Sequence, residues 1–331
     1  MGPLEDMKQR NVGNSGVKVS LLGLGCNNFG LRMPVEDSQA VIKKALDVGI
    51  TFFDTADVYG QRGGSETALG QYLGSRLKDV FIATKFGNAM DEEGKLRGGS
   101  RAYVRQAIEA SLKRLKRDWI DLYQMHRPDP KVPIEETLRT LDDLVKEGKI
   151  RYIGFSQLAG WELADRHWIA RHNGLNPVTA VEIEYSLLNR DPERELVPAM
   201  RQYGVGLLPF YPLASGFLTG KYKRGAPLPE GGRLTKGKSY ADLFMTDSNW
   251  TVLERLEAFC AARGRNLLEL ALSWLAAQPV MLSVIAGATR AEQVAANVKA
   301  IDWELTSQEL AEIDGITGKP PASGRTQRRT A

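Results

Sequence analysis

Residues 49–60 read GITFFDTADVYG, and this stretch decides the fold that the sequence predicts. Ile50 to Phe53 form a β-branched and aromatic run without helical periodicity, which indicates a buried strand. Asp54 follows directly and Tyr59 comes soon after, so a carboxylate and a phenol stand where the strand ends. Parallel α/β folds keep their chemistry at such strand ends. A plainer interpretation stays open, in which Asp54 caps the next turn and Tyr59 is an ordinary half-buried ring.

Apolar runs of the same kind recur on both sides of this strand and alternate with amphipathic segments. The predicted strands are Leu21–Leu24, Ile50–Phe53, Val80–Thr84, Ile120–Met125, Ile150–Phe155, Ala180–Ile183, Val205–Phe210 and Met281–Ile285. Helices are predicted between them, at Val35–Val48, Glu66–Leu73, Ser100–Leu115, Ile134–Glu147, Trp161–Asn173, Asp191–Tyr203 and in a C-terminal set from Asn249. Ser100 and Asp191 are typical N-caps, and the predicted helix stops are Gly49, Gly74, Gly148, Gly174 and Gly204.

Eight alternating units predict a parallel sheet that closes into a (β/α)8 TIM barrel, an α/β fold. A β-hairpin at Gln9–Ser20 precedes the barrel, extra helices follow it, and residues 1–331 are expected to form one domain. The alternative is a doubly wound open sheet. That fold requires a glycine-rich loop with a helix directly behind the first strand, and residues 23–30, GLGCNNFG, have the wrong spacing. The barrel is therefore favoured.

Two stretches break the alternation. Residues 221–250 are rich in Gly, Pro and Lys without clear periodicity, which predicts either a functional lid or a disordered segment. Residues 318–331 lack apolar side chains apart from small ones, and this composition predicts a flexible tail.

Composition narrows the class of partner. The chain carries 44 Lys and Arg against 40 Asp and Glu, a net charge of +4, and no basic stripe of the kind that nucleic-acid binding needs. Phosphate groups on a small ligand suit that mild excess better. Two cysteines are too few for a disulfide framework, and no apolar run approaches the ~18 residues of a membrane span. We therefore expect a cytoplasmic protein that binds neither membrane nor nucleic acid; whether its native start is Met1 or Met7 stays open.

Four side chains at the predicted barrel mouth make one chemical device. Lys85 and His126 each follow an apolar run directly, as Asp54 does. Taken singly, Lys85 could be a snorkelling lysine and His126 a backbone-bonded histidine. Together with Tyr59 and Asp54 they suggest proton transfer. An ammonium beside a phenol lowers the pKa of the phenol from near ~10, and a carboxylate holds that ammonium in place. The clusters of ligands that a metal would require are absent from the sequence.

With these residues in place, the chain resembles the aldo-keto reductase family over nearly its whole length. The resemblance rests on several motifs in order: GITFFDTADVYG, ATK at Ala83–Lys85, LYQMHRPDP at Leu122–Pro130, IRYIGFS at Ile150–Ser156, EIEYSLLNR at Glu182–Arg190, PLASGFLTGKY at Pro212–Tyr222 and GATRAEQVAANV at Gly287–Val298. It implies an NAD(P)H-dependent oxidoreductase that reduces an aldehyde or ketone, or runs in reverse, by direct hydride transfer.

The resemblance also assigns residues. Tyr59 would be the general acid, Lys85 and Asp54 would tune it, and His126 would orient the substrate. The expected cofactor-binding residues are Gly25, Cys26, Asn27, Asp54, Ser156, Gln157, Glu182, Phe210, Tyr211, Pro212, Leu213, Gly216, Leu218, Lys221, Arg233, Ala286, Gly287, Thr289, Arg290, Gln293 and Asn297. The expected substrate pocket is Asn28, Tyr59, Phe86, His126 and Arg127.

Some residues depart from the family pattern. Gln157 and Glu182 stand where Asn and Gln are more frequent, and Phe210 stands where Tyr or Trp is common. In the segment expected to bind the 2′-phosphate of NADPH, only Thr289 and Arg290 offer polar side chains. Arg290 could bind that phosphate through two parallel hydrogen bonds. NADPH is therefore favoured over NADH.

The residues also bear on two other functions. A Schiff-base lyase would want a barrel lysine without an adjacent carboxylate, which Asp54 opposes. The alternative that stays open is a regulatory cofactor-binding subunit resembling potassium-channel β subunits, with slow or no turnover. The substrate is expected to be a small carbonyl or alcohol compound, and the sequence leaves monomer and homo-oligomer equally open.

Overall fold

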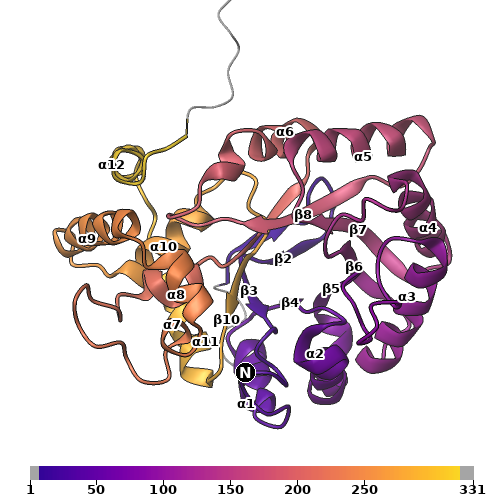
Figure 1. The fold of residues 1–331 in the computed structure, drawn as a ribbon, viewed down its shortest axis with the longest axis horizontal. Coiled ribbons are helices and arrows are strands. Elements are labelled where there is room, and N and C mark those ends of the chain that lie inside the picture. The colour runs from indigo at the N-terminus through magenta and orange to yellow at the C-terminus, as the bar shows by residue number, and fades with distance from the viewer. Residues whose placement is uncertain (1–6, 321–331) are drawn as a thin grey trace, which may run out of the picture.

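The fold is an eight-stranded parallel barrel surrounded by helices, seen in a computed structural model that describes residues 7–320 (Figure 1). The barrel strands are β3 Leu22–Gly25, β4 Phe52–Asp54, β5 Phe81–Phe86, β6 Ile120–Met125, β7 Ile150–Ser156, β8 Val178–Glu184, β9 Gly206–Phe210 and β10 Val284–Gly287. They neighbour one another in the order β10-β3-β4-β5-β6-β7-β8-β9. The predicted TIM barrel is thus confirmed, and the open sheet is wrong.

The barrel closes between β9 and β10, the two ends of this strand order. The Leu207 amide donates to the Val280 carbonyl at 2.8 Å, and the Leu282 amide donates back to the Leu207 carbonyl at 2.9 Å. These two bonds join β9 to the segment that leads into β10. All strand ends therefore face the same mouth, as a barrel requires.

The helices that connect the strands lie where the sequence places them, with two corrections. They are α1 Ser38–Asp47, α2 Tyr59–Tyr72, α3 Arg101–Leu115, α4 Ile134–Lys146, α5 Gly160–His172, α6 Leu196–Tyr203, α9 Asp247–Ala261, α10 Leu267–Ala276, α11 Ala291–Ala300 and α12 Ser307–Thr317. The first correction is that α2 begins at Tyr59, with left-handed backbone at residues 60–62 and Gly63 at φ 120° before its regular turns. The second correction concerns the N-cap of α6.

Ser100 is the predicted N-cap of α3, and its hydroxyl accepts from the Tyr103 amide at 3.4 Å. Asp191 is not an N-cap of α6. It opens a separate 3-10 turn, η2 Asp191–Glu193, with Pro192 inside it, and α6 starts only at Leu196. The predicted glycine stops are confirmed, since all five take positive φ just after a helix, where a side chain would be strained.

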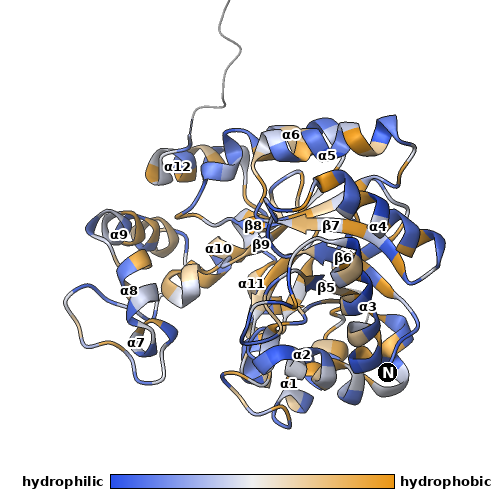
Figure 2. Ribbon diagram, turned by 45° about the vertical axis from the view of Figure 1, so that its right-hand side comes forward, coloured by the Kyte–Doolittle hydropathy of each residue, from blue (hydrophilic) through white to orange (hydrophobic). Residues whose placement is uncertain are grey.

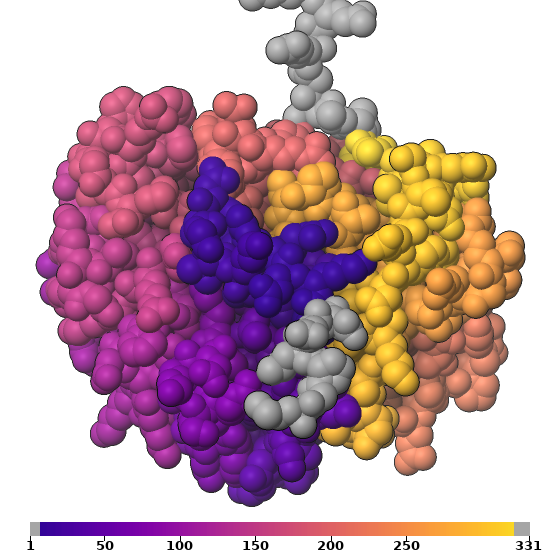
Figure 3. All heavy atoms as spheres, turned by 180° about the vertical axis from the view of Figure 1, so that it is seen from behind, coloured from indigo at the N-terminus to yellow at the C-terminus, as the bar shows by residue number. Residues whose placement is uncertain are grey.

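The predicted hairpin is formed by β1 Gln9–Asn11 and β2 Lys18–Ser20, and it closes the N-terminal end of the barrel. In Figure 3 it lies across the middle of the back face, between the first strands and the C-terminal helices. Val12 and Val19 from this hairpin pack in one cluster with the barrel-interior side chains Phe52, Phe81, Ala83, Leu122, Ala180, Leu208, Leu282 and Ile285. The hairpin therefore covers one end of the barrel, and the carboxyl ends of the strands lie at the other.

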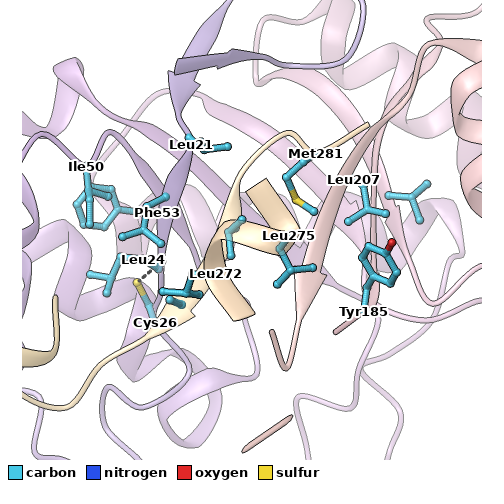
Figure 4. Close-up of a cluster of buried hydrophobic side chains, with 14 of the residues drawn as sticks. Leu21, Leu24, Cys26, Ile50, Phe53, Tyr185, Leu207, Leu272, Leu275 and Met281 are labelled. Atoms are coloured by element: carbon cyan, nitrogen blue, oxygen red, sulfur yellow. Dashed lines mark hydrogen bonds between the residues drawn. The ribbon is translucent and has the colours of Figure 1, made fainter. Parts of the chain in front are cut away.

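The larger core lies between the barrel and its helices, where hydrophobic strands meet helices with many hydrophilic residues (Figure 2). Figure 4 shows part of it, with Leu24, Cys26 and Phe53 on one side and Leu207, Met281 and Tyr185 on the other. This packing fixes the direction of each strand, and so fixes which residues end up at the mouth.

The stretch at residues 221–250 is not disordered. It holds two short helices, α7 Arg233–Lys236 and α8 Lys238–Phe244, and it is anchored by the buried side chains of Leu234 and Phe244. The Tyr222 hydroxyl accepts from the Leu234 amide at 3.2 Å. Its role as a lid stays a prediction.

Of the predicted tail at residues 318–331, all but the first three residues lie outside the described part of the chain, as do residues 1–6. Within residues 7–320, no helix combines the length and the apolar character needed to cross a bilayer.

Candidate active site

Alternation along the barrel strands brings polar side chains into one layer at the mouth. On β5 the side chains of Phe81, Ala83 and Lys85 share the interior face, so two apolar residues lie below one lysine. The same order holds on β4, where Phe52 precedes Asp54, and on β8, where Ala180 precedes Glu182. The apolar layers exclude water below, and the charged layer lies directly above them.

Lys85 is the centre of this layer. Its ammonium is fully buried and lies 2.7 Å and 2.8 Å from the two carboxylate oxygens of Asp54, 3.0 Å from the Thr55 carbonyl and 3.0 Å from Glu182 Oε2. Burial favours the neutral amine, but the carboxylates of Asp54 and Glu182 outweigh it and raise the pKa of Lys85. The lysine is therefore cationic at every physiological pH.

Tyr59 lies next to this cation, with the Lys85 Nζ atom 5.3 Å from the centre of its ring. The expected lowering of its pKa is wrong for this structure. Burial raises the pKa of the phenol, and Glu182 and Asp54 add to that rise, while Lys85 alone lowers it. Tyr59 therefore remains a protonated phenol, ready to donate, and its acid strength depends on the balance of charge behind it.

His126 completes the group that the sequence predicted. Its ring meets the Tyr59 ring edge to face, with centroids 5.6 Å apart and planes at 83°. Burial, together with the charges of Lys85 and Arg127, lowers the pKa of His126 to about 3. Its Nδ1 atom is buried and has no partner among the described residues. A neutral imidazole of this kind can donate one hydrogen bond to a substrate oxygen without carrying charge.

The end of β7 joins the two sides of the site. Gln157 adopts φ 60°, a left-handed conformation that is rare outside glycine, and its amide nitrogen donates to the Glu182 carbonyl at 2.8 Å. Its side chain donates to the His126 carbonyl at 3.2 Å. Ser156, one residue earlier, is buried opposite Glu182 in the strand register. Gln157 thus fixes His126 and Glu182 relative to each other.

The segment after β9 is strained. Tyr211, Ala214 and Ser215 all take positive φ values (52°, 46° and 57°), before Gly216 at 92°. Such residues cost about 1–3 kcal/mol each and gather at functional sites. The Ser215 hydroxyl is buried without a partner among the described residues, and a Cβ on Gly216 would lie only 3.3 Å from Lys221 Nζ. Close backbone and orphaned donors suit a phosphate-bearing ligand here.

Cations gather beside that segment. Lys221 has its pKa lowered by burial and by the nearby charge of Arg290, and neither forms an ion pair among the described residues. Helix α11 starts beside Arg290, and its N-cap has no side-chain hydrogen bond. Thr289 donates from its amide to Gln293 Oε1 at 2.7 Å. A helix N-terminus with two facing cations fits phosphate groups.

Arg233 lies between two phenols. Its guanidinium is 5.1 Å from the ring centres of both Tyr211 and Tyr240, and its Nε atom has no partner among the described residues. The Tyr211 hydroxyl donates to the Tyr240 hydroxyl at 3.3 Å, and the Phe210 ring meets Tyr211 edge to face. Arg233, Tyr211 and Phe210, which were assigned to cofactor binding, thus lie close together, and their contact with a cofactor stays a prediction.

Four of the predicted site residues pack their side chains into the larger hydrophobic core. Phe86 lies on the opposite face of β5 from Lys85 and packs on Tyr123 in the outer core, so it does not line the substrate pocket. Cys26 donates to the Leu24 carbonyl at 3.5 Å in the same core, and burial raises the pKa of its thiol. The side chains of Leu218 and Ala286 also lie in this core, whereas Asn297 is buried on α11 and its cofactor contact stays a prediction. For Cys26, Leu218 and Ala286, only the backbone can face a ligand.

The loop after β3 keeps its predicted place. Asn28 donates to the Ala288 carbonyl at 3.2 Å, and its Oδ1 atom is buried without a partner among the described residues. Gly25 pairs with Gly287 in the register of β3 and β10. Asn27, in the same loop, is half-buried. Of the predicted site residues in other loops, Leu213 is half-buried, Pro212 is buried and Arg127 is exposed.

Sequence reasoning missed two members of the site. Gln124 is buried and donates to Glu182 Oε2 at 3.2 Å, and strand alternation from His126 could have placed it on the interior face. Tyr240 lies in the stretch without periodicity, where no pattern indicated it. Among residues 7–320 no group of His, Cys, Asp and Glu side chains is arranged to hold a metal ion.

Comparison with known proteins identifies the family. A family model described as the aldo/keto reductase family matches residues 21–317. A protein of Glycine max named "Probable aldo-keto reductase 1" is 38% identical over 310 residues, which cover 91% of this chain and 86% of that protein.

Proposed function

The chain belongs to the aldo/keto reductase family, and from that premise we propose that it reduces an aldehyde or ketone with NADPH, using Tyr59 as the proton donor. Membership of the family supports the coarser part of this statement, an oxidoreductase that acts on carbonyl groups of small molecules. The cofactor preference and the role of Tyr59 are our proposal.

One observation carries the proposal. The phenol of Tyr59 lies between the buried Lys85 ammonium and the neutral His126 ring, at distances of 5.3 Å and 5.6 Å from its own ring centre. A carbonyl oxygen held by both rings would accept a hydrogen bond from each.

Each residue of the site has its own role in the proposed reduction. A reduced nicotinamide cofactor, when bound, supplies the hydride that the carbonyl carbon accepts. Tyr59 gives its proton to the oxygen as negative charge develops there, and His126 holds that oxygen by a second hydrogen bond. Lys85 stabilises the phenolate that Tyr59 becomes, and Asp54 keeps the ammonium in place. The apolar layer beneath, with Phe52 at its centre, excludes water from below.

The cofactor assignment rests on the other half of the mouth. Phe210 would cover the nicotinamide ring and Ser156, Gln157 and Glu182 would hold its carboxamide. Lys221 and Arg233 would meet the pyrophosphate, next to the strained turn at Ser215. Arg290, at the start of α11, would pair with a 2′-phosphate, which is the reason for preferring NADPH.

The test combines binding and turnover. Titration of tryptophan fluorescence with NADPH and, separately, NADH measures cofactor affinity, and a panel of aldehydes and ketones measures turnover. Tyr59→Phe is expected to abolish turnover while cofactor affinity stays nearly intact, because the hydroxyl is removed and the ring is kept. Equal loss of both would overturn the role of Tyr59.

The same experiment separates the alternative. Tight binding of NADPH without turnover on any carbonyl would favour a cofactor-binding regulatory subunit. Absence of binding to either cofactor would mean that Gln157 and Glu182, which depart from the family pattern, have disabled the site. The cytoplasmic location also stays a prediction, for which fractionation of cells that express the chain is the measurement.

A further inference from the structure

Glu182 brings a second carboxylate to the catalytic lysine. The Glu182 Oε2 atom lies 3.0 Å from Lys85 Nζ, and the side chains of both are almost fully buried, at 4% and 0% exposure. Gln124 holds the same oxygen from the neighbouring strand by an amide hydrogen bond of 3.2 Å. The contact joins β5 and β8, which are not adjacent in the barrel.

The three donors of Lys85 are all used. An ammonium has three N–H groups, and its hydrogen bonds here go to the two carboxylate oxygens of Asp54 at 2.7 Å and 2.8 Å and to the Thr55 carbonyl at 3.0 Å, while Glu182 Oε2 forms an ion pair at 3.0 Å. Lys85 therefore acts on Tyr59 through its electric field, and the carboxylates behind it decide how much of that field remains.

The charges of the cluster do not balance. One ammonium and two ionised carboxylates leave a net charge of −1 in a buried layer, and burial of an uncompensated charge is costly. Two carboxyls that share one site relieve this cost when they retain a proton between them.

We propose that Glu182 is a second counter-ion of Lys85, that it shares one proton with Asp54, and that loss of this proton weakens Tyr59 as an acid. Glu182 is then a positioning residue that acts on the reaction through Lys85. This inference rests on the proposed function for its effect on catalysis, while the shared proton itself does not depend on that function.

The surroundings of the pair support the proposal. Burial and the Glu182 carboxylate raise the pKa of Asp54 well above its usual range, against the lowering by Lys85. The other titratable groups that interact electrostatically with the cluster are the Cys26 thiol, which lies in the outer core, the Tyr59 phenol and the neutral His126 imidazole. Each of these groups is uncharged near neutral pH. Lys85 is therefore the cation that offsets the two carboxylates.

The proposal predicts a direction for the pH dependence. While the proton is held, the cluster is neutral and the lysine field favours the Tyr59 phenolate. When rising pH removes the proton, the net charge of −1 disfavours that phenolate and proton donation slows. Carbonyl reduction is therefore expected to fall as the pair ionises, at a pH below the titration of Tyr59 itself.

The first measurement is infrared difference spectroscopy of the full chain between about pH 5 and about pH 10. A protonated carboxylic acid has its own carbonyl stretch, and wild type is expected to show this band at neutral pH and lose it at alkaline pH. Glu182→Gln, which keeps the shape and removes the charge, is expected to lack the band. Asp54→Asn is expected to lack it as well, so a folding defect in one variant leaves the other as a test. All proteins compared carry Asp57→Asn as a common background, because burial raises the pKa of the Asp57 carboxyl to about 8 and its own band would otherwise titrate in the same range.

Glu184→Gln is the matched control, because it makes the same chemical change two residues along the same strand on a half-buried carboxyl. The band is expected to persist in this variant. A wild-type protein without the band, or a band that survives in both Glu182→Gln and Asp54→Asn, would overturn the shared proton.

The second measurement is the single-turnover rate of carbonyl reduction with NADPH across the same pH range. Wild type is expected to slow by about 10-fold or more through the titration, while Glu182→Gln changes by less than about 2-fold. The same pH step in both proteins would overturn the link to Tyr59. A wild type that shows the band yet reduces no carbonyl would refute the proposed function and leave the shared proton established.

Discussion

Tyr59 and His126 meet edge to face, with their ring centroids 5.6 Å apart, although one begins a helix and the other ends a strand. The contact places a phenol and an imidazole within reach of one substrate oxygen. It also buries the imidazole, and this burial sets its charge.

The first prediction concerns that charge. Because the pKa of His126 is lowered to about 3, the ring is neutral throughout the pH range of an ordinary assay. The profile of kcat/KM against pH should therefore show no step from His126 near its usual value of ~6.5. His126→Ala should lower kcat by about 10²–10³-fold, the usual cost of one lost donor to a developing oxyanion. A step near pH ~6.5 that disappears in the variant would contradict a neutral ring.

The same shift makes a prediction about stability. Between about pH 3 and ~6.5 the unfolded chain binds a proton at His126 that the folded chain does not. Stability should therefore fall as the pH decreases below ~6.5, and this component should stop growing below the folded value. Urea unfolding at a series of pH values measures it. His126→Gln, which cannot titrate, should show a weaker decline over that window, and an unchanged slope would contradict the assignment.

A second stability prediction uses two glycines of α2. A Cβ on Gly70 would lie 2.3 Å from the Arg114 carbonyl oxygen, because α2 and α3 pack with their backbones in contact. Gly70→Ala should therefore destabilise the fold by about 1–3 kcal/mol. At Gly64 the nearest atoms are 3.8 Å and 3.9 Å away, so Gly64→Ala should be neutral or stabilise by up to about 1 kcal/mol. Equal effects in urea unfolding would refute the close helix contact.

A third stability prediction concerns Arg190, the last residue of the EIEYSLLNR motif. Its guanidinium binds both carboxylate oxygens of Glu193 at 2.7 Å and 2.8 Å, and it also reaches Asp314 at 2.7 Å in the last helix, α12. Arg190→Leu should destabilise the chain by about 3 kcal/mol, because the partly buried Glu193 would lose its cationic partner and keep only the hydrogen bond from the Tyr185 hydroxyl. The exposed Arg194→Leu is the control and should change stability by less than about 0.5 kcal/mol. Similar losses in the two variants would mean that Arg190 does not anchor α12.

The last prediction tests the cofactor assignment at Arg290. Arg290→Gln should weaken NADPH binding by about 10–100-fold, the value of a charge-assisted hydrogen bond, and should leave NADH binding nearly unchanged. Lys299→Gln removes the same charge at the other end of α11 and should alter neither affinity. The readout is fluorescence titration with both cofactors. Equal weakening of NADPH and NADH would show that Arg290 does not read the 2′-phosphate.

The sequence by itself determined the barrel and the positions of its reactive groups. Strand periodicity is local, so Phe52 and Phe53 already indicated a strand and Asp54 its end. Since the ends of parallel strands share one mouth, the chain order alone assigns Lys85 and His126 to the same site. The hairpin and the glycine helix stops were predictable for the same local reason.

Only the tertiary structure decided how these groups act on one another. The ion pair of Glu182 with Lys85 crosses the barrel interior, whereas the sequence pattern indicated only a cofactor contact for Glu182. Phe86 is adjacent to Lys85 in the chain yet faces the opposite core. The direction of the Tyr59 pKa shift depends on burial and on two carboxylates at once. Hydrophobic periodicity and motif spacing depend on neighbours along the chain. The charge state and desolvation of a side chain depend on distances in space, which only the closed barrel sets.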